Sequence, residues 1–453
     1  MSDRGMSRRY FLMGASATVG AIAGAATGPA RGSDRVRAPR RRRISANDKL
    51  NIAGIGIGGQ GGRDVDHFAT LGENIVALCD VDDAYAAKTF ERYPAAKTYR
   101  DFRVMLEKQK DIDAVVVGTP DHLHAFVAMT AIQLGKHVYC EKPLTHSIHE
   151  ARVLAEAARN AKVATQMGNQ GQASEDARVL AELIWDGAIG NVREIHGWCN
   201  RNPSISPRGM ARPGGSSPVP STLDWDLWLG PAPFRPYVEG AYLPFVWRGW
   251  WDFGTGVLGD IGCHNCSAIF KALKLGHPTS VEATSTAAQS PPEVNAESAP
   301  IASIVHYEFP AVGDRPGVTL TWWDGGLMPR RPEELEPDRK FGGGDGMLYI
   351  GDKGKILNHD LIPESRKIEY GVPPKKLPRS PGHGAEWVNA CKGGEPAGSN
   401  FDFAGLLTEV ILLGNVAIRT GKRLLWDGPN MTVTNVPEAN QLINPPYRDG
   451  WKL

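Results

Sequence analysis

Between residues 50 and 167, short apolar stretches alternate with longer segments in which apolar residues recur every three or four positions. The short stretches predict buried strands at residues 50–55, 75–78, 114–117, 137–140 and 163–167. The longer segments predict helices at residues 65–71, 84–92, 102–108, 124–134 and 147–160. Strands that alternate with helices are typical of a parallel sheet covered by helices, so we expect an α/β domain over residues 47–168.

The pattern changes after Gly171. A helix to about residue 185 and a strand at 192–198 precede a Pro/Gly-rich passage at 202–220, which has no apolar periodicity and predicts a long loop. Strands rich in β-branched and aromatic residues are then predicted at 280–283, 302–309, 318–323, 347–350 and 355–357, and helices at 386–391 and 403–420. We therefore expect a second, α+β domain with a large, mostly antiparallel sheet at 169–430 and a C-terminal tail at 431–453.

The first residues differ from both domains. The stretch SRRYFLMG carries the pair Arg8 and Arg9, and a run of small and apolar residues follows at 11–26. This run is too short and too weakly apolar for a spanning helix of ~20 residues, and its order of charge, apolar run and small residues is typical of an export signal. It resembles a twin-arginine signal peptide over residues 1–30, which predicts export to the periplasm or beyond and no membrane span.

Charge is distributed unevenly along the chain. Ten of the 51 basic residues but only two of the 50 acidic residues lie within residues 1–45, which leaves a formal charge of −7 on the remainder. The basic run at 31–46 also contains proline and is typical of a solvated linker. An acidic folded part disfavours a nucleic-acid partner.

Six cysteines lie far apart, at 79, 140, 199, 263, 266 and 391. The spacing is neither that of a zinc ribbon nor that of a disulfide scaffold, so we expect reduced core residues and no metal site.

A glycine-rich loop follows the first predicted strand. The stretch IGIGGQG at 55–61 contains Gly56, Gly58 and Gly61 and opens a predicted helix, and Asp80 ends the next strand. Glycines at these positions let the backbone approach a pyrophosphate, and the helix N-terminus attracts its charge. Asp80 would bind a ribose 2′-hydroxyl and repel a 2′-phosphate, so NAD is expected rather than NADP.

Three further motifs carry polar residues at places where an open α/β sheet binds ligands. TPDHLH at 119–124 follows a strand and supplies Thr119, Pro120 and His124, although Asp121 serves equally well as a helix cap. EKP at 141–143 places Glu141 and Lys142 just past another strand. DIGCH at 260–264 places Asp260 and His264 four residues apart, which on a helix is one face.

The ordered set IGIGGQG, CD at 79–80, TPDHLH, EKP and DIGCH resembles the Gfo/Idh/MocA family, which includes glucose-fructose oxidoreductase and inositol dehydrogenase. The resemblance covers roughly residues 49–428. It implies an N-terminal Rossmann domain that binds NAD(P), a C-terminal domain with an open sheet that often mediates homo-oligomers, and hydride transfer on sugars or polyols. Lys142, Asp260 and His264 match the lysine, aspartate and histidine of the family.

These three residues also suit the chemistry by themselves. Oxidation of a secondary alcohol needs a base for the hydroxyl proton, and neutral His264 suits that task near pH 7. The Lys142 cation would stabilise charge on the oxygen, and Asp260 would orient substrate or tune the histidine.

Substrate choice is not implied by the resemblance. Many members of the family have an arginine soon after the strand that follows EKP, whereas this chain reads QMGNQ at 166–170, so Asn169 is the candidate contact there. Seven of the twelve tryptophans lie between residues 225 and 323. We expect most of them in the core and about two at the site, where Trp247 would stack on a sugar and Arg248 would bind its hydroxyls.

An exported protein that binds NAD could not exchange its used cofactor, because no NAD pool would recycle the cofactor outside the cell. Since twin-arginine export carries folded proteins, we expect a tightly held cofactor that is reduced and re-oxidised in place. A sugar oxidoreductase that uses two substrates in turn meets this condition. A redox-neutral glycosidase that oxidises C3 and eliminates the leaving group is an alternative, and a non-catalytic carbohydrate-binding protein is another.

Overall fold

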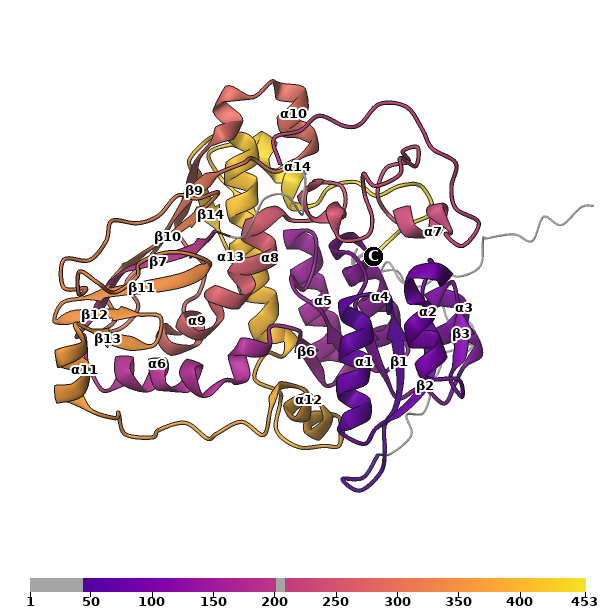
Figure 1. Cartoon of the computed structure of the whole chain (residues 1–453), viewed down its shortest axis with the longest axis horizontal. Helices are drawn as coiled ribbons and strands as arrows, with labels where there is room; N and C mark the ends of the chain where they lie inside the picture. The colour runs from indigo at the N-terminus through magenta and orange to yellow at the C-terminus, as the bar shows by residue number, and fades with distance from the viewer. Residues whose placement is uncertain (1–43, 201–207) are drawn as a thin grey trace, which may run out of the picture.

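The computed structural model describes residues 44–200 and 208–453; the expected signal peptide and most of the basic linker lie outside the described residues. The N-terminal sheet has six parallel strands in the order β3-β2-β1-β4-β5-β6 (Figure 1). This is the strand order of a dinucleotide-binding fold, as the alternation of strands and helices predicts. The strands are β1 (Asn51–Ile55), β2 (Asn74–Cys79), β3 (Lys97–Tyr99), β4 (Ala114–Val117), β5 (His137–Cys140) and β6 (Thr165–Met167).

Helices cover both faces of this sheet because its central strands are apolar on both sides. All four residues of β4 are buried. The helices that follow the strands are α1 (Gln60–Thr70), α2 (Asp83–Arg92), α3 (Phe102–Lys108), α4 (Asp121–Gln133) and α5 (Ile148–Ala161). A further helix from late in the chain, α12 (His383–Cys391), packs Trp387 against Phe68 and Tyr139. The N-terminal domain is therefore completed by residues that the sequence assigned to the second domain.

The second sheet has nine strands in the order β13-β12-β11-β7-β10-β9-β8-β14-β15. Among its paired strands, β7 and β10 run parallel and the other pairs run antiparallel, which confirms the expected mostly antiparallel sheet. Its strands are β7 (Val192–Cys199), β8 (Ser280–Ser285), β9 (Ser303–Phe309), β10 (Val318–Asp324), β11 (Asp345–Gly351), β12 (Gly354–Leu357), β13 (Asp360–Ile362), β14 (Leu424–Asp427) and β15 (Thr432–Val433).

One face of this sheet packs on helices α8 (Gly256–Asn265), α9 (Ser267–Leu273) and α13 (Phe401–Thr420), and α6 (Glu175–Trp185) packs in turn on α9 (Figure 1). The alternation along β9 explains the packing, because Val305 and Tyr307 are buried while His306 and Glu308 point to the other face. Helix α13 also packs against α5, so it joins the two domains.

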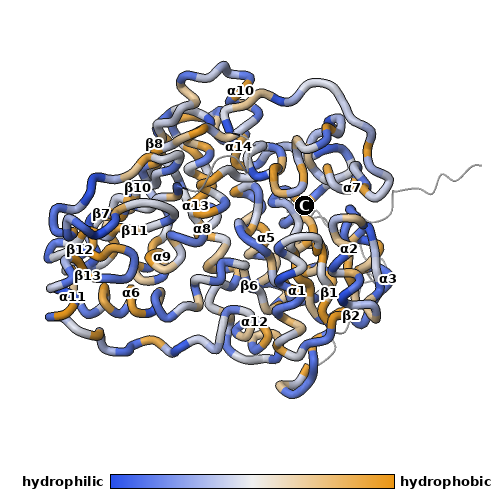
Figure 2. The backbone as a smooth tube through the Cα atoms, viewed as in Figure 1, coloured by the Kyte–Doolittle hydropathy of each residue, from blue (hydrophilic) through white to orange (hydrophobic). Residues whose placement is uncertain are grey.

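Helix α13 is the one described helix long and apolar enough to cross a membrane, but 83% of its most apolar window is buried inside the protein. It is coloured hydrophobic along much of its length in Figure 2, whereas the loops at the edge of the second sheet are largely hydrophilic. Its apolar character therefore belongs to the core.

The remaining short helices lie mostly at the periphery: α7 (Trp225–Leu229), α10 (Pro292–Glu297), α11 (Glu364–Tyr370), α14 (Asn440–Ile443), and the 3-10 helices η1 (Gln170–Ala173), η3 (Val246–Gly249), η4 (Thr286–Gln289) and η5 (Pro437–Ala439). Residues 431–453, expected to be a tail, thus contain β15, η5 and α14. All six cysteines are buried and unpaired, as expected.

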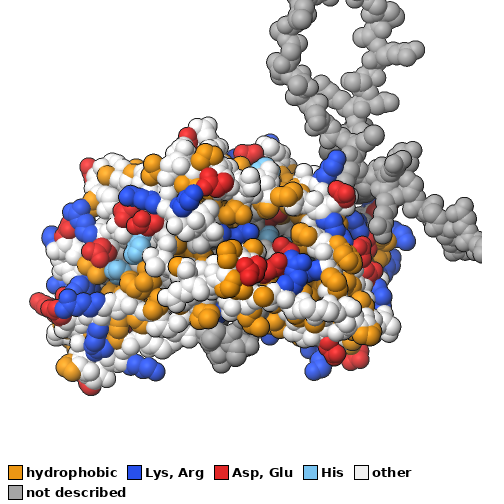
Figure 3. All heavy atoms as spheres, turned by 90° about the horizontal axis from the view of Figure 1, so that it is seen from above, with side chains coloured by type: hydrophobic (Ala, Val, Ile, Leu, Met, Phe, Trp, Pro, Cys, Tyr) orange, Lys and Arg blue, Asp and Glu red, His pale blue; other side chains and the backbone are white. Residues whose placement is uncertain are grey.

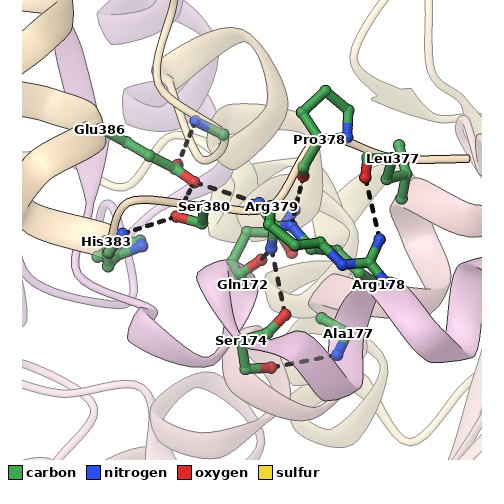
Figure 4. A network of polar contacts seen from close by, with 12 residues as sticks. Gln172, Ser174, Ala177, Arg178, Leu377, Pro378, Arg379, Ser380, His383 and Glu386 are labelled. Atoms are coloured by element: carbon green, nitrogen blue, oxygen red, sulfur yellow. Dashed lines mark hydrogen bonds and ion pairs between the residues drawn. The ribbon is translucent and has the colours of Figure 1, made fainter. Parts of the chain in front are cut away.

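Arg178 on α6 holds the segment before α12 in place (Figure 4). Its guanidinium donates to the carbonyls of Pro378, Gln172 and Ser174 and pairs with Glu386 on α12 at 3.3 Å. Both charged side chains are largely buried, so the ion pair holds α12 against α6. The hydrogen bond from Arg178 to the carbonyl of Gln172 holds η1 against the same residue.

On the face seen from above, acidic and basic side chains lie interspersed (Figure 3). Neither sign of charge gathers over a large part of this face.

Candidate active site

A cavity of about 490 Å³ lies at the carboxyl ends of β1, β2, β4 and β5, where the second domain meets the first. Most of the residues singled out in the sequence line it: Gly56, Gly58, Asp80, Thr119, Pro120, His124, Glu141, Lys142, Trp247, Arg248, Asp260 and His264. Gly61 lies just behind the glycine loop, and Asn169 does not line the cavity.

The glycine loop has the close packing that a pyrophosphate site requires. Gly56 has φ of +75°, and a Cβ there would lie 2.6 Å from the backbone nitrogen of Thr119. A Cβ on Gly61 would lie 2.3 Å from the carbonyl oxygen of Gly56. Helix α1 starts at Gln60 without a side-chain cap, so the N–H groups of its first turn face the loop. These residues fit a dinucleotide phosphate.

Asp80 closes the end of β2 beside this loop. Its carboxylate accepts hydrogen bonds from the backbone N–H of Gly58 at 2.9 Å and of Asp82 at 3.0 Å. Burial raises the pKa of Asp80 to about 6, while these backbone donors act to lower it. The carboxylate is thus fixed at the position where a ribose hydroxyl binds in this fold. Arg100 also reaches the cavity, but it is paired with Asp83.

Two buried carboxyl groups, those of Asp64 and Glu141, lie near each other between the glycine loop and EKP. Glu141 accepts a hydrogen bond from Gln170 at 3.0 Å, and Asp64 on α1 accepts one from Gln60 at 2.8 Å. Burial and the neighbouring Glu141 raise the pKa of Asp64 to about 8, so the pair retains a proton at neutral pH. Asp64 could not be predicted from the sequence, because it lies outside every motif.

Lys142, Asp260 and His264 come together in the same cavity. The ammonium group of Lys142 donates to the backbone carbonyl of Asp260 at 2.9 Å and pairs with its carboxylate. Burial would raise the pKa of Asp260, but Lys142 and Arg248 hold it below its usual value. His264 follows one turn later on α8, which confirms the shared helix face.

Asp121 is not the helix cap that the sequence allowed. Helix α4 has Pro120 as its N-cap residue and no side-chain cap, and the Asp121 carboxyl accepts from the hydroxyl of Thr255 at 2.8 Å. Burial raises the pKa of Asp121 to about 7. Since Thr255 precedes α8 directly, this contact positions the helix that carries Asp260 and His264.

His124 lines the cavity but its ring bridges two backbone segments. Its ring nitrogens lie 2.8 Å from the carbonyl oxygens of Pro143 and Thr119. Burial lowers its pKa to about 4, so the ring is neutral and its single N–H donates to one of these two carbonyls, while the other nitrogen only packs against the second. It therefore holds the Thr119 loop against EKP rather than serving as a proton carrier.

Arg248 lies between two aromatic rings. Its guanidinium carbon is 3.7 Å from the ring centroid of Phe245 and 4.3 Å from that of Trp247, and its Nε lies 3.4 Å from the carboxylate of Asp260. Of the seven tryptophans between residues 225 and 323, Trp228 and Trp247 line the cavity, and five pack elsewhere, as the sequence predicts.

The prediction that Asn169 contacts the cavity is wrong. Its side chain is fully buried, and its amide donates to the hydroxyl of Ser267 at 3.0 Å, which in turn donates to Gln172. The residue faces α9 and does not line the cavity, so its side chain anchors η1 instead of reaching the expected position at the site.

Comparisons with known proteins agree with this geometry. Residues 50–169 match the model of an oxidoreductase family with an NAD-binding Rossmann fold, and residues 213–453 match the C-terminal alpha/beta domain of the same family. An inositol 2-dehydrogenase from Salmonella paratyphi B is 31% identical over 156 residues, 33% of this chain and 45% of that protein. A levoglucosan dehydrogenase from Pseudarthrobacter phenanthrenivorans is 26% identical over 187 residues, 41% of this chain and 39% of that protein. Each alignment spans less than half of the relative.

Solved structures share the whole fold. The WlbA dehydrogenase from Bordetella pertussis, in complex with NADH and UDP-GlcNAcA, superposes with a TM-score of 0.57 at 17% identity over 84% of this chain and 99% of that one. A levoglucosan dehydrogenase in complex with NADH superposes with a TM-score of 0.54 at 18% identity over 83% of this chain and 98% of that one.

Proposed function

The chain belongs to the Gfo/Idh/MocA family of NAD-binding oxidoreductases, and from this premise we propose that it oxidises a secondary alcohol of a sugar or sugar derivative with an NAD that is held tightly and recycled in place. The observation that carries the proposal is the meeting of Lys142, Asp260 and His264 in the cavity that the glycine loop opens into. The named relatives act on polyols and anhydrosugars by their names, which supports the substrate class.

The cavity residues divide into two groups. Gly56, Gly58 and Asp80 would hold the phosphates and a ribose of NAD, with Thr119, Pro120 and Glu141 along the cavity toward Lys142. When bound there, NAD supplies the hydride acceptor.

Lys142 has the geometry to bind the reacting oxygen. An ammonium group has three donors, and two of them point to the carbonyl and carboxylate oxygens of Asp260. The third donor is left for a hydroxyl in the cavity, where the cation stabilises negative charge that develops on that oxygen. Because Asp260 stays ionised, it holds the ammonium in this orientation.

His264 acts as the base in this proposal. It lines the cavity one helical turn after Asp260 on α8, and in this proposal its ring accepts the hydroxyl proton while Lys142 binds the oxygen. Trp247 and Arg248 line the same cavity, with Arg248 beside Asp260, and would orient the sugar ring.

We further propose that the protein leaves the cytoplasm by the twin-arginine route with its cofactor bound. The order of Arg8, Arg9 and the apolar run supports this route, and a retained cofactor is the consequence.

A single-turnover experiment tests the function. Purified enzyme with bound NAD is mixed with a panel of sugars and polyols, and the absorbance of bound NADH at about 340 nm is followed. An increase with at least one sugar, reversed by a second carbonyl substrate, supports the oxidoreductase. Release of an aglycone from a glycoside without net NADH supports the glycosidase instead, and no response together with sugar binding supports a non-catalytic protein.

A further inference from the structure

A segment of the second domain lies across the cofactor end of the cavity. Leu223 forms an antiparallel bridge with Asp82, two residues after Asp80. The N–H of Asp83 donates to the carbonyl of Thr222 at 3.0 Å, and the N–H of Asp224 donates to Val81 at 2.8 Å. Backbone hydrogen bonds therefore join residues 222–224 to the loop that follows Asp80, the residue whose carboxylate would bind the ribose.

Both ends of the following strap, residues 225–253, contact one buried histidine, whose backbone N–H donates to the carbonyl of Phe253 at 3.3 Å and whose neutral ring has a single N–H to donate. His122 on α4 lies with one ring nitrogen 3.0 Å from the carbonyl oxygen of Trp228 and the other 3.3 Å from that of Phe253. Its ring packs against the rings of both residues. These contacts hold the strap at the cavity. Strap residues such as Trp228 and Phe245 line the cavity.

Residues 447–451 reach the same place from the C-terminal part of the chain. Arg448 donates from its backbone N–H to Pro231 at 2.8 Å, and its guanidinium pairs with Asp226 on α7 at 2.8 Å. Trp451 donates from its backbone N–H to the carbonyl of Arg448 at 3.1 Å. This segment is therefore anchored on the strap, and the C-terminus lies beside α7 in Figure 1.

Trp451 closes an apolar part of the cavity. Its ring centroid lies 5.4 Å from that of Phe126 and 6.5 Å from that of Phe102, and the guanidinium of Arg103 lies 4.9 Å from its ring. Trp451, Phe102 and Val127 all line the cavity. Phe102 opens α3 just after β3, and β3 lies beside β2 on the side away from β5, so Phe102 and the Trp451 ring against it lie toward Asp80 and away from Lys142.

The position of Asp80 identifies what this apolar part would hold. In this fold the acidic residue at the end of β2 binds the adenosine ribose, so the adenine lies just beyond it. A flat aromatic ligand fits a slot lined by Phe102, Val127 and an indole. We propose that Trp451 forms the outer wall of the adenine site and that residues 447–451, held to the strap through Arg448, slow the release of NAD.

This inference rests on the retained NAD of the proposed function and explains it by residues outside the Rossmann domain. Separate binding measurements with the two halves of NAD distinguish a role of Trp451 at the adenine from a role in binding the whole cofactor. AMP and nicotinamide mononucleotide are titrated against the cofactor-stripped full chain and three variants: Trp451→Ala, Trp451→Phe and Lys452→Ala. Lys452 is the matched control, since it is the exposed neighbour of Trp451.

For Trp451→Ala we expect AMP binding to weaken by roughly 10-fold or more, as for loss of a base-stacking aromatic, with nicotinamide mononucleotide binding unchanged. Trp451→Phe should restore most of the AMP affinity, and Lys452→Ala should match the wild type. The rate of NAD release should rise in Trp451→Ala and in Arg448→Ala, because the second variant frees the segment from α7.

Unchanged AMP affinity in Trp451→Ala would overturn the adenine wall, and so would an equal loss for both half-ligands. Normal NAD release from Arg448→Ala would overturn the anchoring role. A wild-type chain that binds neither NAD nor AMP would instead contradict the proposed function itself.

Discussion

The ammonium group of Lys142 donates to the backbone carbonyl of Asp260 at 2.9 Å, although 118 positions separate the two residues. Lys142 follows β5 of the Rossmann domain and Asp260 lies on α8 of the second domain, so this contact assembles the site from both domains. Arg248 approaches the same carboxylate at 3.4 Å. One carboxylate thus orients two cations that line the cavity.

Removal of either reacting group should slow hydride transfer. We expect Lys142→Met and His264→Ala each to lower the single-turnover rate by roughly 10² or more, since each removes a group that acts on the alcohol. Bound nucleotide, counted after denaturation, should be unchanged. Lys108→Met, an exposed lysine at the end of α3, is the control. Near-normal rates in either site variant with cofactor retained would show that its role is wrongly assigned.

Arg248 should act on substrate binding more than on chemistry. Arg248→Ala removes a guanidinium held between Phe245 and Trp247, so we expect KM for the sugar to rise roughly 10-fold with a smaller change in kcat. Arg248→Lys keeps the charge but not the planar group, and should recover only part of the affinity. A fall in kcat alone, with KM unchanged, would contradict a binding role.

Asp80 should decide between the two nicotinamide cofactors. Asp80→Ser removes the carboxylate that the Gly58 and Asp82 N–H groups fix, so NAD affinity should fall roughly 10-fold and the preference for NAD over NADP should narrow. Titrations of both cofactors against the stripped protein measure this, with Glu91→Gln on the exposed side of α2 as the control. Retention of full discrimination would indicate that other residues exclude the 2′-phosphate.

The sequence predicted the parts of the fold and site that short stretches of chain encode. The four buried residues of β4 and the glycine loop after β1 are visible as local patterns. The contact of Asp121 with Thr255 is not, because it joins residues 134 positions apart that belong to no common motif. The position of Trp451 at the cavity could not be predicted from the sequence either, because it depends on how residues 447–451 pack against the strap and α4.

Asn169 was predicted to lie at the site and does not line the cavity. Its place after β6 suggested a cavity residue, but the side chain turns toward Ser267 on α9, where buried hydrogen bonds fix it. Position at the end of a strand indicates the edge of the sheet, whereas the direction of the side chain depends on packing with helices that a single strand does not specify.

Export should depend on the arginine pair alone. Because the arginine pair is expected to be an export address and not a structural element, we expect Arg8→Lys with Arg9→Lys to leave folded, cofactor-loaded enzyme in the cytoplasm. Replacing Arg40 and Arg41 of the linker by lysine is the matched control and should not change export. Fractionation with an immunoblot and a count of bound NAD measures both. Equal export of the two variants would refute the signal assignment.

The buried carboxyl of Asp121 should make stability depend on pH. Its pKa in the folded protein is about 7 because of burial, above the ~3.9 of an unfolded chain. Between these values the folded state binds the proton more strongly, so this group lowers the free energy of unfolding as the pH rises from about 4 to 7. His122 and His124 act in the opposite direction, because burial lowers their pKa values to about 3 and 4 and the unfolded chain takes up their protons first as the pH falls. The comparison must therefore isolate Asp121.

Asp121→Asn isolates it, because the amide oxygen still accepts from Thr255 and the histidines contribute equally to both proteins. We expect the difference in unfolding free energy to shift in favour of the variant as the pH rises from 4 to 7, and then to level off. Urea denaturation at several pH values measures this difference. A difference that does not change with pH would mean that Asp121 titrates alike in both states, and that its burial beside Thr255 does not hold the proton. A difference that moves in favour of the wild type would mean that Lys142 and Arg248 outweigh burial and keep Asp121 ionised, as they do for Asp260.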